Sequence, residues 1–189
     1  VPGTDMPLYD VTFPFIRMQA GFSDFTPGGF RNASRKDFQP IYYNPLTMGT
    51  RCHQIAMYIM HDSPFTMLAD NPCIYEQEKE CTQFIADIPT IFDEMKIIDG
   101  KMGEYIIIAR KIRNDWYVAG QTNWNEREVA FSLPFIENPS EYTVEYITDG
   151  INANKDARDY ILKRENAAKK DWQIRMAQGG GFAIKLKKK

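Results

Sequence analysis

The stretch Phe13–Phe30, FPFIRMQAGFSDFTPGGF, carries the pattern that decides the fold of the first half of the chain. Apolar residues recur at helical spacing over Val11–Gln19, and Gly21 is typical of the residue just beyond a helix C-terminus. Phe22–Thr26 then predicts a short strand, closed by the turn Pro27-Gly28-Gly29. The stretch therefore predicts a helix, a strand and a tight turn in succession.

A second block, His53–Tyr75 (HQIAMYIMHDSPFTMLADNPCIY), follows the same order. The apolar run after His53 predicts a largely buried helix, Ser63–Thr66 predicts a short strand, and Met67–Ile85 predicts a further helix. Residues 31–48, between the two blocks, are polar, aromatic and proline-bearing, so we expect a long loop that lies over a site. This alternation of helices and strands is typical of a parallel α/β unit.

Beyond Gly100 the hydrophobic period becomes two. Tyr105–Ala109 and Trp116–Gly120 flank a polar turn and predict a hairpin. Further alternating strands are expected at Val129–Leu133, Tyr142–Tyr146, Trp172–Met176 and Phe182–Leu186. Short strands at this spacing predict a small antiparallel β-sandwich, with the polar residues 149–159 as a connecting loop. We expect two domains, residues 1–100 and residues 101–189.

The composition excludes several classes of protein. About 43% of the 189 residues are apolar and 25% are charged, which is the ordinary mixture of a soluble globular chain. The net charge of −2 argues against a nucleic-acid partner, and the basic run Lys185–Lys189 is interpreted as a solvated tail. No apolar run approaches the ~18 residues of a membrane span.

The cysteines and histidines do not predict a metal site or a disulfide. Cys73 and Cys81 are about two helical turns apart, roughly 12 Å along a helix axis, which is too far for a disulfide. His53 and His61 have no cysteine partner at zinc-ligand spacing. We therefore assign no metal ligand in this chain and expect the thiols to be free.

An ordered series of short motifs resembles the C-terminal part of glycoside hydrolase family 97, a group of bacterial α-glucosidases and α-galactosidases. In the first half the matching motifs are Arg17–Gly21, Ser23–Gly28, His53-Gln54, Ser63-Pro64, Met67–Asp70, Tyr75-Glu76 and Pro89-Thr90. In the second half they are Asp93-Glu94, Gly103–Tyr105, Ala109-Arg110, Trp116–Val118, Asp149-Gly150, Asn152-Ala153 and Gly179–Ala183.

The resemblance implies an architecture and a division of labour. Family members have an N-terminal β-sandwich, a central (β/α)8 barrel and a small C-terminal β-domain. This chain would supply the last two βα units of the barrel and then the antiparallel β-sandwich. The catalytic and calcium-binding glutamates of the family lie before these positions, so we assign no catalytic residue here.

The resemblance also implies a function for the intact protein. We expect the C-terminal part of an exo-acting α-glycosidase that hydrolyses α-glucosides or α-galactosides, with calcium bound by the intact enzyme and little activity in this chain alone. The implied partners are an oligosaccharide substrate, the preceding barrel and N-terminal β-sandwich, and a second copy through the C-terminal domain. A periplasmic or secreted location follows the family, although no signal peptide is seen. Glucoside or galactoside preference, and retention or inversion, stay open.

Two carboxylates are the candidates for substrate binding. Barrel enzymes place functional side chains at the C-terminal ends of strands, and Asp24 lies near the end of the predicted strand Phe22–Thr26. The alternative for Asp24 is a turn-capping role before Pro27. Asp70 follows the second predicted strand, where the alternative is a carboxylate favoured by the dipole of the next helix.

Aromatic residues offer a second kind of sugar contact. Phe25, Phe30, Tyr42 and Tyr43 lie in or beside the long loop and could stack on sugars, although anchoring of the loop is the simpler interpretation. The alternative function is a non-catalytic β-sandwich for oligomerisation or carbohydrate binding. Exposed rings at Trp116 and Trp124 would favour its carbohydrate-binding form.

Overall fold

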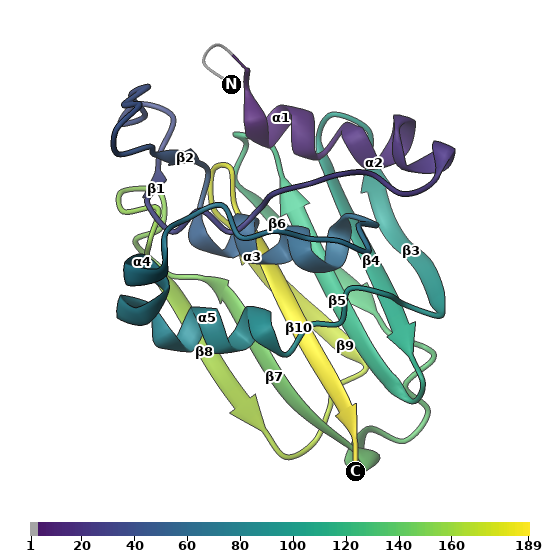
Figure 1. Cartoon of the computed structure of the whole chain (residues 1–189). Coiled ribbons are helices and arrows are strands. Elements are labelled where there is room, and N and C mark those ends of the chain that lie inside the picture. Colours follow the sequence, from purple (N-terminus) through teal and green to yellow (C-terminus); the bar gives the residue numbers. More distant parts are fainter. Residues whose placement is uncertain (1–3) are drawn as a thin grey trace.

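The computed structural model describes residues 4–189 and has three layers (Figure 1). Helices cover one face of a six-stranded antiparallel sheet, and a two-stranded sheet covers the other face. The helices are α1 (Met6–Asp10), α2 (Phe13–Ile16), α3 (Arg51–Met60), α4 (Pro72–Gln77) and α5 (Lys79–Ala86), with short 3-10 turns at Met18–Ala20 and Pro139–Glu141. These helices are too short and too polar to cross a membrane.

The strands of the second half form a continuous antiparallel sheet in the order β3-β4-β5-β10-β7-β8. The C-terminal strand β10 lies at its centre, with Ala183 opposite Ala119 of β5 and Ile147 of β7. Strands β6 and β9 form the separate two-stranded sheet. The bounds are β3 (Glu94–Lys101), β4 (Tyr105–Ile112), β5 (Asp115–Thr122), β6 (Arg127–Ser132), β7 (Tyr142–Asp149), β8 (Tyr160–Glu165), β9 (Asp171–Met176) and β10 (Gly181–Lys188).

All six strands expected from the period of two are present, as β4, β5, β6, β7, β9 and β10. The edge strands β3 and β8 were not predicted. A bulge between Ile97 and Asp99 interrupts the alternation of β3, and YILKRE of β8 has little apolar pattern because only part of it faces the core. Strand β3 crosses residue 100, the expected domain boundary, so the sheet begins at Glu94.

The two strands expected in the first half are not confirmed. Neither Phe22–Thr26 nor Ser63–Thr66 forms a strand. The segments lie side by side, since the Ser23 amide donates to the Asp62 carbonyl at 3.0 Å and the Phe25 ring stacks on His61 at 3.8 Å between ring centres. One backbone hydrogen bond does not make a ladder, and a parallel strand needs neighbours along its length. Residues 31–48 are mostly loop, with a two-residue parallel pairing of β1 (Asn32–Ala33) and β2 (Thr47–Met48).

Proline explains why the predicted helices are shorter than expected. The helix expected over Val11–Gln19 is reduced to α2 and a 3-10 turn, because Pro14 occupies a first-turn position where a helix starts; α1, which has Pro7 in its own first turn, precedes this range. The helix expected over Met67–Ile85 begins only at Pro72 and breaks at Glu78. The helix after His53 is confirmed as α3, and the Thr50 hydroxyl caps it by accepting the His53 amide at 3.1 Å.

Helix α3 packs between the sheet and the segments of the first half. Nine of its ten residues are buried, and its closest neighbours in the sheet are β10 and β5. One core lies between α3, α5 and the sheet, and includes Ile55, Ile59, Phe84, Ile108 and Ala183. A second core lies between the two sheets and includes Val118, Phe131, Trp172, Phe182 and Ile184. The central strands β4, β5 and β10 of the six-stranded sheet are therefore buried on both faces.

Two buried cations join the helical layer to the sheet. Lys185 of β10 forms ion pairs with Asp87, at 3.1 Å from Nζ to Oδ2, and with Glu145. Arg110 of β4 donates to the Met60 carbonyl at 3.2 Å and pairs with Asp62 at 3.1 Å. The interpretation of Lys185–Lys189 as a solvated tail is thus wrong, because most of this run is the central strand.

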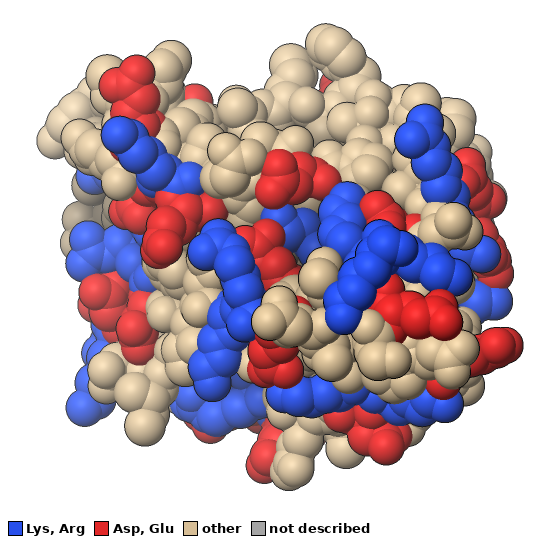
Figure 2. Space-filling view, turned by 90° about the horizontal axis from the view of Figure 1, so that it is seen from below, with Lys and Arg blue, Asp and Glu red and all other residues tan. Residues whose placement is uncertain are grey.

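On the face shown in Figure 2, basic and acidic side chains are interspersed.

A buried polar cluster surrounds the start of α3. His53 donates from Nδ1 to the Gly180 carbonyl at 3.0 Å. Its Nε2 lies 3.1 Å from Oδ2 of Asp10, within hydrogen-bond distance. Asp149 accepts the amides of Ala177 at 2.8 Å and Gly181 at 3.0 Å. Burial raises the pKa of Asp149 to about 6, and the hydrogen bonds it accepts from Thr50 and the two amides only partly oppose this shift.

We expect Asp149→Asn to change how stability depends on pH. Between about pH 4 and 6 the unfolded chain loses this proton while the folded chain keeps it, so the free energy of unfolding falls by about 3 kcal/mol as pH rises through this window. The side chain of asparagine keeps one oxygen that can accept the amides of Ala177 and Gly181, and it has no carboxyl proton to lose. Urea unfolding from pH 4 to 7 should show the variant gaining about 3 kcal/mol relative to wild type.

The difference between the two proteins is the quantity to measure. His61 is buried and its pKa is lowered to about 3, mainly by that burial, so it destabilises the fold as pH falls below its ordinary value of 6.5. This opposite trend is common to both proteins. A difference that stays constant from pH 4 to 7 would contradict titration of Asp149 in this window.

Candidate functional site

The turn Pro27-Gly28-Gly29 is held by side chains from two helices. Gln54 Oε1 on α3 accepts the Gly28 amide at 3.1 Å, and the Tyr58 hydroxyl, one helical turn later, donates to the Pro27 carbonyl at 3.0 Å. The Tyr75 hydroxyl of α4 donates to the Gly28 carbonyl at 2.8 Å. Gly28 has a φ of +89°, and a Cβ there would collide with the Tyr58 hydroxyl, so only glycine fits.

Burial fixes the protonation of the two tyrosines. It raises the pKa of Tyr58 and of Tyr75 above the ordinary value, and each hydroxyl contacts a backbone carbonyl. Both hydroxyls therefore stay protonated and act as donors. Gln54 and Tyr58 could have been found from their spacing of four on one helix face, whereas the role of Tyr75 depends on a contact across 47 residues.

Asp70 binds the backbone on the other side of this turn. Its Oδ2 accepts the Phe30 amide at 2.9 Å and its Oδ1 accepts the Asn71 amide at 3.2 Å. Its own amide donates to the Tyr75 hydroxyl at 2.9 Å. Both carboxylate oxygens thus have backbone partners, which is a structural role; the substrate-binding role of Asp70 stays a prediction.

Asp24 lines a cavity of about 380 Å³ beside the same turn. Its side chain is exposed and is the single carboxylate among the described residues that line the cavity. The walls come from the segment 24–27, the loop residues Phe38 and Leu46–Met48, and Gln54, Met57 and Ala69. Met6 completes the lining. Asp24 therefore faces a cavity of sugar size, while Asp70 is not among its lining residues.

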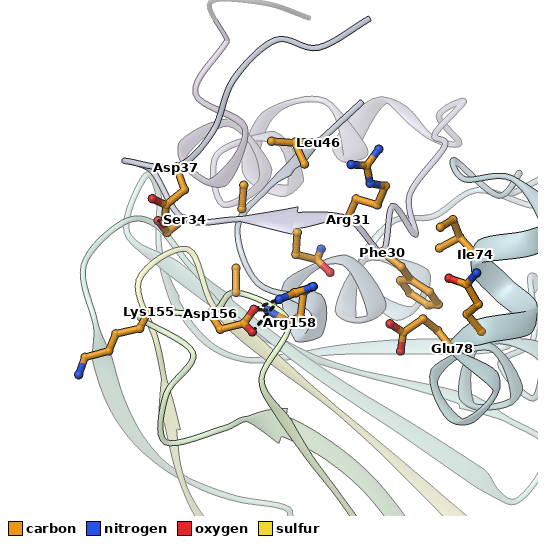
Figure 3. A pocket seen from close by; sticks show the side chains of 14 residues that line it. Phe30, Arg31, Ser34, Asp37, Leu46, Ile74, Glu78, Lys155, Asp156 and Arg158 are labelled. Atoms are coloured by element: carbon orange, nitrogen blue, oxygen red, sulfur yellow. Dashed lines mark hydrogen bonds and ion pairs between the residues drawn. The ribbon is translucent and has the colours of Figure 1, made fainter. Parts of the chain in front are cut away.

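A larger cavity of about 580 Å³ lies between the loop 31–37, α4 and residues 155–158 (Figure 3). Its three acidic side chains and Arg158 have partners, whereas no ion pair of Arg31 or Lys155 is found in the described part of the chain. Arg158 binds Asp156 through both carboxylate oxygens, at 2.9 and 3.0 Å, and Ser34 donates to Asp37. Glu78 pairs with the buried Arg51. Because the acidic side chains of this cavity already have partners whereas the side chain of Asp24 is exposed, the Asp24 cavity is the stronger candidate for a site that binds through a carboxylate.

The structure separates the aromatic candidates. Phe25 stacks on His61, and Phe30 is buried edge-on to Tyr75 at 5.3 Å, so both rings have structural roles. Tyr42 and Tyr43 are 84% and 92% exposed, so they do not anchor the loop.

The tryptophans proposed for a sugar-binding sandwich are not free. Trp116 is buried and stacks on Phe135 at 3.9 Å between ring centres, and Trp124 is partly buried with its indole donating to Asp5 at 2.6 Å. The carbohydrate-binding form of the alternative function therefore loses the rings on which it depended.

We expect Tyr75→Phe to destabilise the folded chain by about 1–3 kcal/mol, because the buried Gly28 carbonyl and the Asp70 amide both lose their partner. Chemical unfolding measures this change. Tyr142→Phe is the matched control, since no hydrogen bond of the Tyr142 hydroxyl is found among the described residues. Equal effects of the two substitutions would contradict the role of Tyr75.

Comparison with known proteins gives one family. The model of the glycosyl-hydrolase 97 C-terminal, oligomerisation domain matches residues 91–187. A retaining alpha-galactosidase of Bacteroides thetaiotaomicron is 46% identical over 188 residues, which is 98% of this chain and 28% of that protein. A probable retaining alpha-galactosidase of Streptomyces bingchenggensis is 25% identical over 109 residues, or 58% of this chain and 16% of that protein.

Solved structures agree with this assignment. A glycoside hydrolase family 97 enzyme from Pseudoalteromonas sp. strain K8, solved as the E480Q variant with panose, superposes with a TM-score of 0.84 at 30% identity, covering 97% of this chain and 29% of that one. The same enzyme with acarbose gives a TM-score of 0.83. The chain spans less than a third of the length of these relatives. It belongs to glycoside hydrolase family 97 and corresponds to the C-terminal part of such a protein.

Proposed function

We propose that this chain is the C-terminal part of an exo-acting, retaining α-glycosidase. The observation that carries the proposal is the 46% identity to a retaining alpha-galactosidase over nearly the whole chain. We therefore place α-galactosides first as the substrate class. α-Glucosides are the second candidate, because the Pseudoalteromonas enzyme was solved with panose and acarbose but shares only 30% identity with this chain.

We also propose that the first part of the chain completes a (β/α)8 barrel and that the accessory β-domain begins near residue 91, where the match to the C-terminal domain and the sheet begin. Two features support this. The extended segments at residues 22–26 and 62–66 lie side by side, as the last two barrel strands would. Outside the long loop, large apolar side chains on this part of the chain are exposed, and they include Leu8, Tyr9, Ile16, Phe22, Phe65, Met67 and Leu68. The preceding barrel strands would cover such a surface.

In this arrangement Asp24 lies where a barrel enzyme binds its substrate, beyond the carboxyl end of a strand. We propose that its carboxylate accepts hydrogen bonds from sugar hydroxyl groups. Glycoside hydrolysis needs two carboxyl groups that flank the scissile bond. Since Asp24 is the one carboxylate of the described residues in its cavity, the catalytic pair is assigned to the preceding part of the enzyme, as the family resemblance implies.

Other parts of the proposal rest on the family alone. Calcium in the intact enzyme is proposed from the family resemblance, which implies that its ligands lie before the positions of this chain. The name of the matching domain supports self-association through the C-terminal part. A periplasmic or secreted location is proposed from the resemblance.

The first test is a chimera in which residues 1–189 replace the corresponding C-terminal part of the Bacteroides alpha-galactosidase. We expect the chimera to hydrolyse nitrophenyl α-galactoside, and the 189-residue chain alone to show no turnover above buffer. A soluble chimera of native molar mass without activity would refute the proposed function. Turnover by the isolated chain would show that its own carboxylates are sufficient.

A second test compares the two candidate carboxylates in the chimera. Asp24→Asn should raise KM about tenfold with little change in Tm, because the side chain is exposed and meets only substrate. Asp70→Ala should lower stability by about 1–3 kcal/mol, because two backbone amides lose their acceptor. The proposal for Asp24 fails if its substitution leaves KM unchanged.

A further inference from the structure

The tip of the long loop presents two adjacent tyrosines to solvent. It reads Gln39–Pro45 (QPIYYNP), and Tyr42 and Tyr43 are the most exposed large apolar side chains that the structure describes. Two aromatic rings in water are costly unless they have a partner, because burying a ring is one of the larger favourable terms in folding and binding. No contact within the described part of the chain explains these rings.

The tip is braced at both ends. Pro40 and Pro45 flank the tyrosines and fix the backbone φ, and the Ile41 amide donates to the Gln39 carbonyl at 2.9 Å. At the base of the loop the Thr47 amide donates to the Arg31 carbonyl at 2.9 Å, within the β1–β2 pairing. The rings are thus presented on a constrained backbone, which lowers the entropy lost when they bind something.

The tip rises from the edge of the Asp24 cavity. Phe38 and Leu46, which precede and follow it, line both that cavity and a smaller hollow of about 190 Å³ that Tyr42 also lines. The Asp24 cavity and the hollow beside Tyr42 are therefore neighbours that share two lining residues. Their surroundings add no charge, since the hollow is lined by Phe38–Tyr42, Pro45 and Leu46.

We propose that Tyr42 and Tyr43 form a stacking platform for the leaving-group sugar of the substrate. The proposal rests on the proposed function: an exo-acting enzyme encloses the terminal sugar, and the rest of the oligosaccharide projects past the rim. A tyrosine ring offers a flat apolar surface to the C–H face of a sugar, and its hydroxyl can hydrogen-bond with the sugar's hydroxyl groups. The platform binds only substrates that carry a sugar as leaving group.

The test compares two substrates in the chimera described above. An α-galactosyl oligosaccharide carries a sugar leaving group, whereas α-galactosyl fluoride releases fluoride and cannot touch the platform. In the variant Tyr42→Ala/Tyr43→Ala we expect kcat/KM for the oligosaccharide to fall about tenfold, mainly through KM, and kcat/KM for the fluoride to change less than about twofold. Tyr42→Phe/Tyr43→Phe keeps the rings and should retain most of the oligosaccharide activity.

Ile151→Ala is the matched control, because Ile151 is 82% exposed on a different loop. It should leave both substrates unaffected. An equal fall for both substrates in the alanine variant would show a structural role and overturn the proposal. So would an unchanged oligosaccharide rate, or a changed molar mass in light scattering, which would place the tyrosines between two copies. If the unsubstituted chimera hydrolyses neither substrate, the proposed function fails and the platform fails with it.

Discussion

The burial of α3 on almost its whole surface is the constraint on which the rest of the structure depends. This helix packs on β5 and β10 with one side, and contacts the turn at residues 27–30 and α5 elsewhere. A helix that is enclosed in this way fixes the positions of the strands and loops that contact it, because protein interiors are close-packed and have low compressibility. The cavity beside Asp24 is formed on this helix through Gln54 and Met57.

Buried charges set the register between the layers. Lys185, Arg110 and Arg51 are almost inaccessible, and each has carboxylate and carbonyl partners from another element. Such pairs add little net stability, since desolvation offsets the attraction, but removing one partner leaves an uncompensated charge. The helical layer therefore has one favourable position on the sheet, and the loop that carries Tyr42 and Tyr43 is positioned by the same framework.

The turn at residues 27–29 connects this framework to the candidate site. Its amide and carbonyl groups are bound by Gln54, Tyr58 and Tyr75, and Asp70 binds the next amide. The fixed turn holds Asp24 on one side and faces the base of the long loop, where a Cβ on Gly29 would collide with Thr47. Family 97 relatives share this fold over 97% of the chain, and the chain forms less than a third of their length. A rigid module of this kind can contribute a wall to a substrate site whose catalytic carboxylates lie on another part of the enzyme.

The sequence by itself determined the elements whose signal is local. The period of two predicted six strands, including the hairpin of β4 and β5, and the apolar run after His53 predicted α3, because these patterns depend on neighbours a few residues apart. The ordered motifs also indicated the family. Only the tertiary structure decided the rest. Edge strands β3 and β8 depend on partners and carry weak patterns. Asp70 binds a backbone amide 40 residues away, whereas Asp24 is exposed. Lys185 is buried against Asp87, which is also distant in the sequence. The exposure of Tyr42 and Tyr43 likewise depends on which distant segments pack nearby.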